Sequence, residues 1–146
     1  MANDEYNVLF TFWLTSRAVH GLLDEALAPA GLTADEFGVY SVLTRSDAMT
    51  PTELARWMSA PPTTVSSYVK RFEARGHVTR ERNPDDGRSY LIKLTPAGRK
   101  AHRAAGVRFL PALDAVAASL GSREPTVKRG LENLKSAVDA TRDANV

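Results

Sequence analysis

Residues 80–100 of the chain read RERNPDDGRSYLIKLTPAGRK, and this stretch decides the fold. Two segments, 77–82 and 89–95, flank an Asn-Pro-Asp-Asp-Gly tip, and the second segment carries the Tyr, Leu and Ile that are typical of half-buried strands. Pro84 and Gly87 favour a bend between the two segments. The stretch therefore predicts a β-hairpin with arginines along its arms, a narrow finger whose charge suits a polyanion.

A helix, a tight turn and a second helix are predicted immediately before the hairpin. Residues 50–53, TPTE, form a capping box with proline at the first helical position, and this short helix is expected to end near Met58. After a turn at residues 59–61, the next helix should cover residues 62–75 and stop at Gly76. Helix, tight turn and helix form a supersecondary unit that binds duplex DNA.

Longer helices are predicted upstream of this unit. Asn3 or Asp4 is expected to cap a first helix that runs to about Ala28, with an apolar surface wider than one stripe. A second capping box at residues 33–36 should begin the next helix, which is expected to end near Ser46. The wide apolar surface predicts that the first helix packs on two sides.

Two further helices are predicted after the hairpin. Thr95 is expected to cap the first of them, with Pro96 at its first position. Pro111 predicts a kink or break near Phe109, and Ser122 is expected to cap the last helix. That last helix carries a narrow apolar stripe with the spacing of a helix–helix seam: Val127, Leu131, Leu134 and Val138.

Length and composition favour one globular domain, or a core with flanking helices. The chain has 146 residues, 43% of them hydrophobic, and no cysteine. Disulfides, thiolate metal sites and thiol-based redox switches are therefore excluded, and the chain suits the reducing cytoplasm. Residues 1–5 carry no positive region, and polar residues interrupt the first apolar segment, so neither a signal peptide nor a membrane helix is expected.

Positive charge is concentrated in the middle of the chain. The net charge of +2 divides into −5 for residues 1–44, +6 for residues 45–103 and +1 for residues 104–146. The cationic middle coincides with the predicted helix-turn-helix and hairpin, so these elements are expected to meet the phosphate backbone.

The helix expected at residues 62–75 has an inner and an outer face. At 100° per residue, Val65, Val69 and Phe72 point one way, with Tyr68 at the edge of that face. The opposite side carries short or cationic side chains, which are Thr63, Ser67, Lys70 and Ala74, with Ser66 and Arg71 on its flanks. Such side chains fit the major groove, where hydroxyls and cations bond base edges or phosphates. The alternative is an ordinary solvated helix face, and the adjoining turn and basic hairpin favour DNA.

The hairpin offers a second candidate contact with DNA. Arg80 and Arg82 supply a charged base for the finger. Asp86 is expected to brace the guanidinium of Arg88, while Gly87 lets the tip approach a groove. Arg88 is therefore the candidate for the minor groove. The alternative is an ordinary exposed ion pair in a turn, which stabilises a protein by about 0–1 kcal/mol.

The order of these elements and four short motifs resemble the MarR family of winged helix-turn-helix regulators, and the resemblance covers nearly the whole chain. The motifs are TTVS at residues 63–66, FEARG at 72–76, DGR at 86–88 and LTPAG at 94–98. The resemblance implies a mainly α, α+β winged-helix fold of about six helices with a two-stranded wing hairpin.

The resemblance also implies how the chain is organised and what it binds. It divides the single chain, residues 1–146, into a winged helix-turn-helix lobe at 33–100 and dimerisation helices at 1–30 and 101–146. The terminal helices of a homodimer would interlock, and two recognition helices would read a pseudo-palindromic operator in double-stranded DNA, with half-sites about 34 Å apart. Arg88 matches the family's wing arginine. The expected function is sequence-specific transcriptional regulation, by family habit as a repressor.

Two features depart from the family's pattern. Pro61 stands where such proteins usually carry a serine-like cap for the recognition helix, and Ser59 is a candidate substitute. The lack of cysteine separates the chain from the family's thiol-switched members. A small-molecule effector is therefore expected as the releasing signal.

Family members often bind aromatic acids or related compounds in a cleft between the dimer helices and the DNA-binding lobe. Trp13, Arg17, His20 and Phe109 are candidates to line such a cleft. Trp13 and Phe109 can equally belong to an ordinary dimer core, and His20 can form an exposed pair with Asp24. The sequence therefore assigns no ligand residue.

Other classes of function find little support. The chain has no phosphate-cradling glycine loop and no nucleophile elbow, and its three histidines lack helical metal-ligand spacing, so no enzyme, cofactor or metal site is expected. A winged-helix protein-interaction module without DNA affinity is the main alternative. The net charge of +6 over residues 45–103 argues against that alternative.

Overall fold

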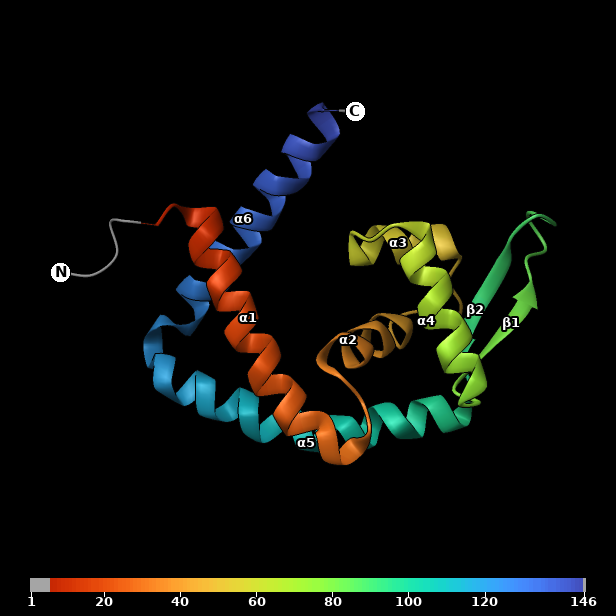
Figure 1. Ribbon diagram of the computed structural model, residues 1–146, viewed down its shortest axis with the longest axis horizontal. Coiled ribbons are helices and arrows are strands. Elements are labelled where there is room, and N and C mark those ends of the chain that lie inside the picture. The colour runs from red at the N-terminus through yellow and green to blue at the C-terminus, as the bar shows by residue number, and fades with distance from the viewer. Residues whose placement is uncertain (1–5, 146) are drawn as a thin grey trace. The chain divides into compact units, whose positions relative to one another are not determined.

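The computed structural model describes residues 6–145, and the chain divides into two compact units whose boundary lies between Leu110 and Pro111. The described part is mainly α-helical, with one two-stranded antiparallel sheet (Figure 1). The elements in chain order are α1 (Val8–Leu27), the 3-10 turn η1 (Ala28–Ala30), α2 (Ala34–Leu43), α3 (Pro51–Met58), α4 (Pro62–Ala74), β1 (Val78–Arg82), β2 (Tyr90–Leu94), α5 (Pro96–Leu120), the 3-10 turn η2 (Gly121–Arg123) and α6 (Glu124–Ala144).

The core of the first unit gathers against one face of α4. Val65, Val69 and Phe72 on that face are buried, as predicted, and the ring of Tyr40 from α2 meets Phe72 edge-on, with 4.6 Å between ring centroids. Burying a side chain of this size stabilises a fold by about 1.5–3 kcal/mol. This packing determines which side of α4 faces solvent.

Capping boxes begin α2 and α3, as the sequence predicts. The Thr33 hydroxyl accepts from the backbone N–H of Glu36, and the Glu36 carboxylate accepts from the N–H of Thr33, both at 3.1 Å. In α3, Thr50 and Glu53 make the same reciprocal bonds at 3.2 and 2.8 Å. Each pair satisfies backbone donors that the first helical turn leaves without a partner.

The cap of α1 differs from the prediction. Asn7 occupies the N-cap position and its side-chain oxygen accepts from the N–H of Phe10 at 3.0 Å, so the helix begins at Val8. The predicted caps, Asn3 and Asp4, lie outside the described residues. Asn7 offers the same side-chain oxygen immediately before the first apolar run, which makes it the nearer capping group. Helix α2 ends at Leu43, before its predicted end near Ser46.

The wing hairpin is formed by β1 and β2, each within its predicted range. Val78 pairs with Leu94 and Arg82 with Tyr90, and the turn between the strands extends beyond α4 in Figure 1. Ile92 also exchanges backbone hydrogen bonds of 2.7 and 3.1 Å with Met49, which precedes α3. The base of the wing is therefore joined to the helix-turn-helix, and the predicted winged-helix fold class is confirmed.

The last helices differ in part from the prediction. Of the kink or break predicted near Phe109, the break is excluded, because helix α5 continues through Pro111, where the boundary between the compact units falls. Ser122 does not cap α6, because the chain stays helical through η2 and Arg123 takes the N-cap position without a side-chain bond. A capping side chain requires an extended backbone, and none of these residues provides one.

Candidate nucleic-acid interface

Helix α4 begins without a side-chain cap. Pro61 occupies the N-cap position in an extended conformation, and its carbonyl accepts from the N–H groups of Thr64 and Val65 at 3.0 and 3.3 Å. Ser59 does not substitute for the missing cap, because it ends α3 in the left-handed conformation, with φ of 50°. Pro62 at the first helical position lacks an N–H that would need a partner, which limits the cost of the missing cap.

The outer face of α4 is open to solvent, as predicted from its sequence. A shallow surface depression of about 320 Å³ lies on this face. It is lined by Thr63, Thr64, Ser67, Tyr68 and Arg71. The other predicted contact residues on this helix, Ser66 and Lys70, are exposed beside it. The face combines hydroxyl donors and acceptors with cationic donors, which are the groups that bond base edges and phosphates.

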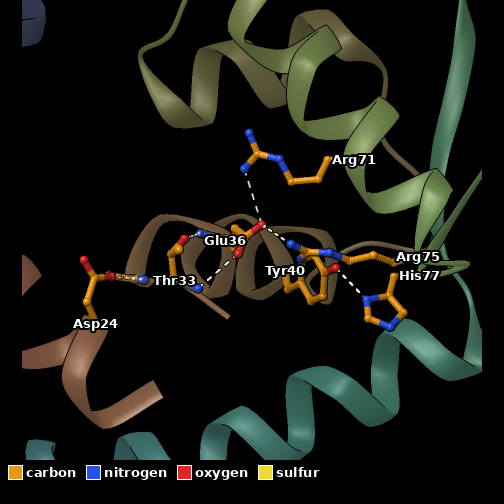
Figure 2. Close-up of polar contacts among 8 residues, drawn as sticks. Asp24, Thr33, Glu36, Tyr40, Arg71, Arg75 and His77 are labelled. Carbon is orange, nitrogen blue, oxygen red and sulfur yellow. Dashed lines mark hydrogen bonds and ion pairs between the residues drawn. The ribbon is translucent and has the colours of Figure 1, made fainter. Parts of the chain in front are cut away.

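Arg71 also interacts with a buried acid that the sequence analysis did not assign to the interface. Its guanidinium donates to Oε2 of Glu36 at 3.4 Å and lies 5.2 Å from the centre of the Tyr68 ring. Arg75, at the end of α4, reaches the same oxygen at 2.8 Å. Figure 2 shows both guanidinium groups directed at the Glu36 carboxylate. The capping box already accounted for Glu36, so its sequence position contained no signal of a second role.

The Glu36 carboxylate stays ionised inside the protein. Its side chain is only 3% exposed. Burial acts to raise the pKa of Glu36, but the hydrogen bond from Thr33 and the interactions with Arg75 and Arg71 outweigh it, so the pKa lies below its ordinary value. Both carboxylate oxygens are used, one for the helix cap and one for the arginines.

Polar contacts continue from α2 to the base of the wing. Burial and then the charge of Arg75 lower the pKa of His77. Its Nδ1 is hydrogen-bonded to the Tyr40 hydroxyl at 2.7 Å (Figure 2). The carbonyl of His77 accepts from the N–H of Thr95 at 3.0 Å, and the Thr95 hydroxyl donates to the carbonyl of Gly76 at 2.6 Å. These bonds hold the end of α4, the start of β1 and the start of α5 together.

The two arginines of β1 have different surroundings. Arg80 donates to Glu73 of α4 at 2.7 Å, and its guanidinium lies 4.7 Å from the centre of the Tyr90 ring. Arg82, at the far end of β1, is exposed. Arg80 therefore joins the wing to α4, and both residues stay predictions as DNA contacts.

At the tip of the wing, Asp86 supports the backbone. Its carboxylate accepts from the backbone N–H of Arg88 at 3.0 Å, and within residues 6–145 the two side chains form no ion pair, so the predicted brace of the guanidinium is wrong. Asn83 makes the same kind of turn, accepting from the N–H of Asp85 at 3.1 Å. Short polar side chains favour such bonds to the backbone two residues on. The Arg88 side chain remains exposed at the tip.

His20, a candidate for the effector cleft, connects α1 to α2. Its Nε2 lies 2.9 Å from Asp35, and its Nδ1 lies 2.7 Å from the carbonyl of Ser16. Both neighbours are acceptors, and the bonds to Ser16 and then to Asp35 raise the pKa of His20. The alternative pair with Asp24 is not formed. Asp24 instead accepts from the backbone N–H of Ala34 at 2.7 Å, at the N-terminus of α2.

The other cleft candidates make different contacts. Trp13 is exposed and stacks on Phe10, while Phe109 packs against Phe37 with 5.1 Å between ring centroids. Arg17 is exposed on α1. Among residues 6–145 no group of three or more acidic or histidine side chains is arranged to hold a metal ion. No ligand residue is assigned.

Both the sequence and the fold match proteins of known family. A model described as the MarR family matches residues 30–89. The HTH-type transcriptional repressor Rv2887 from Mycobacterium tuberculosis is 34% identical to this chain over 112 residues, which cover 76% of this chain and 81% of that protein.

Two solved structures share the fold across most of the chain. The crystal structure of the M. tuberculosis transcriptional regulator MOSR in complex with DNA has a TM-score of 0.84 and 30% identity, and the match covers 94% of this chain and 99% of that chain. The crystal structure of a mutant MarR from E. coli complexed with operator DNA has a TM-score of 0.77 and 26% identity, covering 88% and 90%. The identity to Rv2887, the family model and this shared architecture lead to one conclusion: the chain belongs to the MarR family of winged helix-turn-helix transcriptional regulators.

Proposed function

We propose that this chain regulates transcription by binding double-stranded DNA at specific sequences, with α4 in the major groove and Arg88 in the adjacent minor groove. The observation that carries the proposal is the exposed outer face of α4, where Thr63, Ser67 and Lys70 lie opposite the buried core residues. The DNA in the structures of MOSR and E. coli MarR supports this choice of partner. Ser66, Arg71, Arg80, Arg82 and Asp86 complete the proposed interface.

The proposed regulator is a homodimer on a pseudo-palindromic operator. In our assignment residues 33–100 form the DNA-binding lobe, and residues 1–30 and 101–146 form the dimer interface. Exposed apolar side chains support this dimer interface, since large apolar residues clustered on the surface of a soluble chain are typical of contacts with another chain. On α1 they are Val8, Leu9, Phe10, Phe12, Trp13, Leu14, Val19 and Leu22, and in the second unit Leu113, Val116, Val127, Leu131 and Val138.

The exposed apolar side chains of the last two helices have a second explanation. By length and composition alone, the helical stretch Pro96–Ala144 is apolar enough to cross a membrane. We assign its apolar residues to the subunit interface and place the protein in the cytoplasm, because the stripe on α6 has the spacing of a helix–helix seam and alternates with charged side chains. The relatives named as transcriptional regulators support this location and a role outside catalysis.

We further propose that the chain represses transcription and that a small molecule, such as an aromatic acid, relieves this repression. Repression rests on the name of Rv2887, and release by a ligand rests on the resemblance to the family and on the lack of cysteine. Selection of bound duplexes from a random pool, repeated with candidate aromatic ligands, tests both specificity and release. A ligand that weakens binding to the selected duplex supports release of the chain from DNA by a small molecule.

The competing function is a winged-helix protein-interaction module. Binding to the selected duplex should be measured across salt concentrations, because each phosphate contact contributes about −0.9 to the slope of log affinity against log salt. We expect a steep negative slope. Failure to enrich any duplex, together with a slope near zero on random DNA, would exclude DNA binding and favour the interaction module.

A further inference from the structure

Two arginines of α4 share one buried acid. Oε2 of Glu36 lies 2.8 Å from Arg75 and 3.4 Å from Arg71, and the other oxygen of the carboxylate accepts from Thr33. A single carboxylate carries one negative charge, so it cannot neutralise both guanidinium groups. The cluster therefore retains one positive charge, next to the outer face of α4.

The two arginines differ in how firmly the protein holds them. Arg75 has the shorter contact, is 33% exposed and lies over the Phe72 ring at 5.9 Å. Arg71 has the longer contact, is 49% exposed and lines the depression on the outer face of α4. Arg75 is therefore the structural partner of Glu36, and Arg71 is the one whose donors reach toward solvent.

The position of Arg71 is restricted from two sides. Glu36 attracts one edge of the guanidinium, and the Tyr68 ring lies 5.2 Å from its centre. A planar guanidinium held in this way presents its remaining N–H donors in a defined direction. Contacts that read sequence require such preorganisation, because a base edge accepts donors only in one geometry.

We propose that Glu36 is a specificity-determining positioning residue, which holds Arg71 in the orientation that reads one position of the bound duplex. The inference rests on the proposed function of the chain as a DNA-binding regulator. Glu36 itself lies beneath α4, so it acts through Arg71 and not by touching DNA.

The substitution Glu36→Gln separates the two roles of this side chain. A glutamine oxygen accepts from the Thr33 N–H in a capping box as glutamate does, but the neutral amide does not attract the arginines. Glu53→Gln is a matched control, because Glu53 occupies the same capping-box position in α3 and forms no ion pair within the described part of the chain.

The experiment measures the preference for a selected duplex, which is the ratio of its affinity to that of random DNA. We expect Glu36→Gln to reduce this preference about tenfold while affinity for random DNA stays at or above the parent's. Glu53→Gln should keep the parent's preference. In an Arg71→Ala background, Glu36→Gln should change the preference less than about twofold, since the residue through which it acts is gone.

Three results would overturn the inference: an unchanged preference in Glu36→Gln, equal losses on selected and random DNA, or the same loss with and without Arg71. If Glu36→Gln does not fold, Arg71→Lys gives the answer, because lysine keeps the charge without the planar donor group. The Arg71→Lys protein should lose preference for the selected duplex, and an undiminished preference would refute the role of Glu36. A parent protein that selects no duplex refutes the proposed function instead.

Discussion

Glu36 is ionised where burial alone would favour its neutral form. Burial acts to raise its pKa, and the Thr33 N–H and the two arginines of α4 reverse the shift. An isolated buried carboxylate would be strongly destabilising, whereas one with bonds to both oxygens contributes to stability as long as it is charged. The contribution of this residue therefore depends on pH.

The parent protein should be more stable than Glu36→Gln at neutral pH, and this difference in the free energy of unfolding should disappear in acid. The folded pKa lies below the ordinary value of 4.5, so the stabilisation is present above pH 4.5 and is lost as pH falls through the folded pKa. At pH 7 we expect a difference of about 1–2 kcal/mol in the free energy of unfolding, because solvent screens the half-exposed arginine. Urea unfolding at pH 7 and at acid pH measures both differences. A gap that is constant with pH would contradict the ion-pair explanation.

Arg88 should contribute to DNA affinity and not to stability. Its backbone N–H completes the turn with Asp86, whereas its side chain is exposed at the tip of the wing. Arg88→Ala is expected to weaken binding to the selected duplex about tenfold and to preserve the dimer, because only the side chain is lost. Arg129→Ala on α6 is the control, because it removes the same single positive charge. Undiminished affinity in Arg88→Ala would contradict the wing assignment.

Among the helices, the starts of α2 and α3 were predicted most directly. The capping boxes of α2 and α3 involve residues three apart, and their bonds form as soon as the local backbone turns. The inner face of α4 was predicted for the same reason, since a helical period determines which side chains share a side. The cap of α6 was not predicted correctly, because a 3-10 turn leaves a weak local signal, and α5 does not break at Pro111.

The junction between the wing and α5 should depend on Gly98. A Cβ at this position would lie 2.1 Å from the carbonyl oxygen of His77, which belongs to the backbone and cannot move aside easily. Gly98→Ala is therefore expected to destabilise the fold by about 1–3 kcal/mol. Gly106→Ala in the same helix is the control. Apart from its chain neighbours and the nearby backbone of the helix, no described atom lies within 4 Å of a Cβ at this position, and alanine should stabilise the helix by about 0.5–1 kcal/mol. Denaturant unfolding measures both, and equal effects would contradict the close contact.

At the scale of the whole molecule, the proposed dimer accounts for the apolar side chains that one chain leaves exposed. Leu131 on α6 is 47% exposed in the single chain, so a charge there is compatible with a folded subunit. Leu131→Glu should dissociate the dimer, because a carboxylate at an apolar seam loses its hydration without gaining a partner.

Sedimentation measures the dissociation caused by Leu131→Glu, and weaker binding to a pseudo-palindromic duplex should accompany it, since one subunit then binds alone. Arg129→Glu, on the opposite side of α6, should leave the dimer intact and serves as the control. A Leu131→Glu protein that remains dimeric would show that α6 does not form the interface.

Features that depend on residues a few positions apart could be predicted without coordinates: the capping boxes, the turn-rich tip, and the inner and outer faces of α4. The partners of Glu36, Asp24 and His20 were not predictable in this way, and neither was the bond from Asp86 to the backbone, because they depend on the folded arrangement. A capping glutamate looks the same in sequence whether or not two arginines lie above it. Ion pairs between distant segments depend on how the helices pack, and packing is set by the whole core rather than by local propensity.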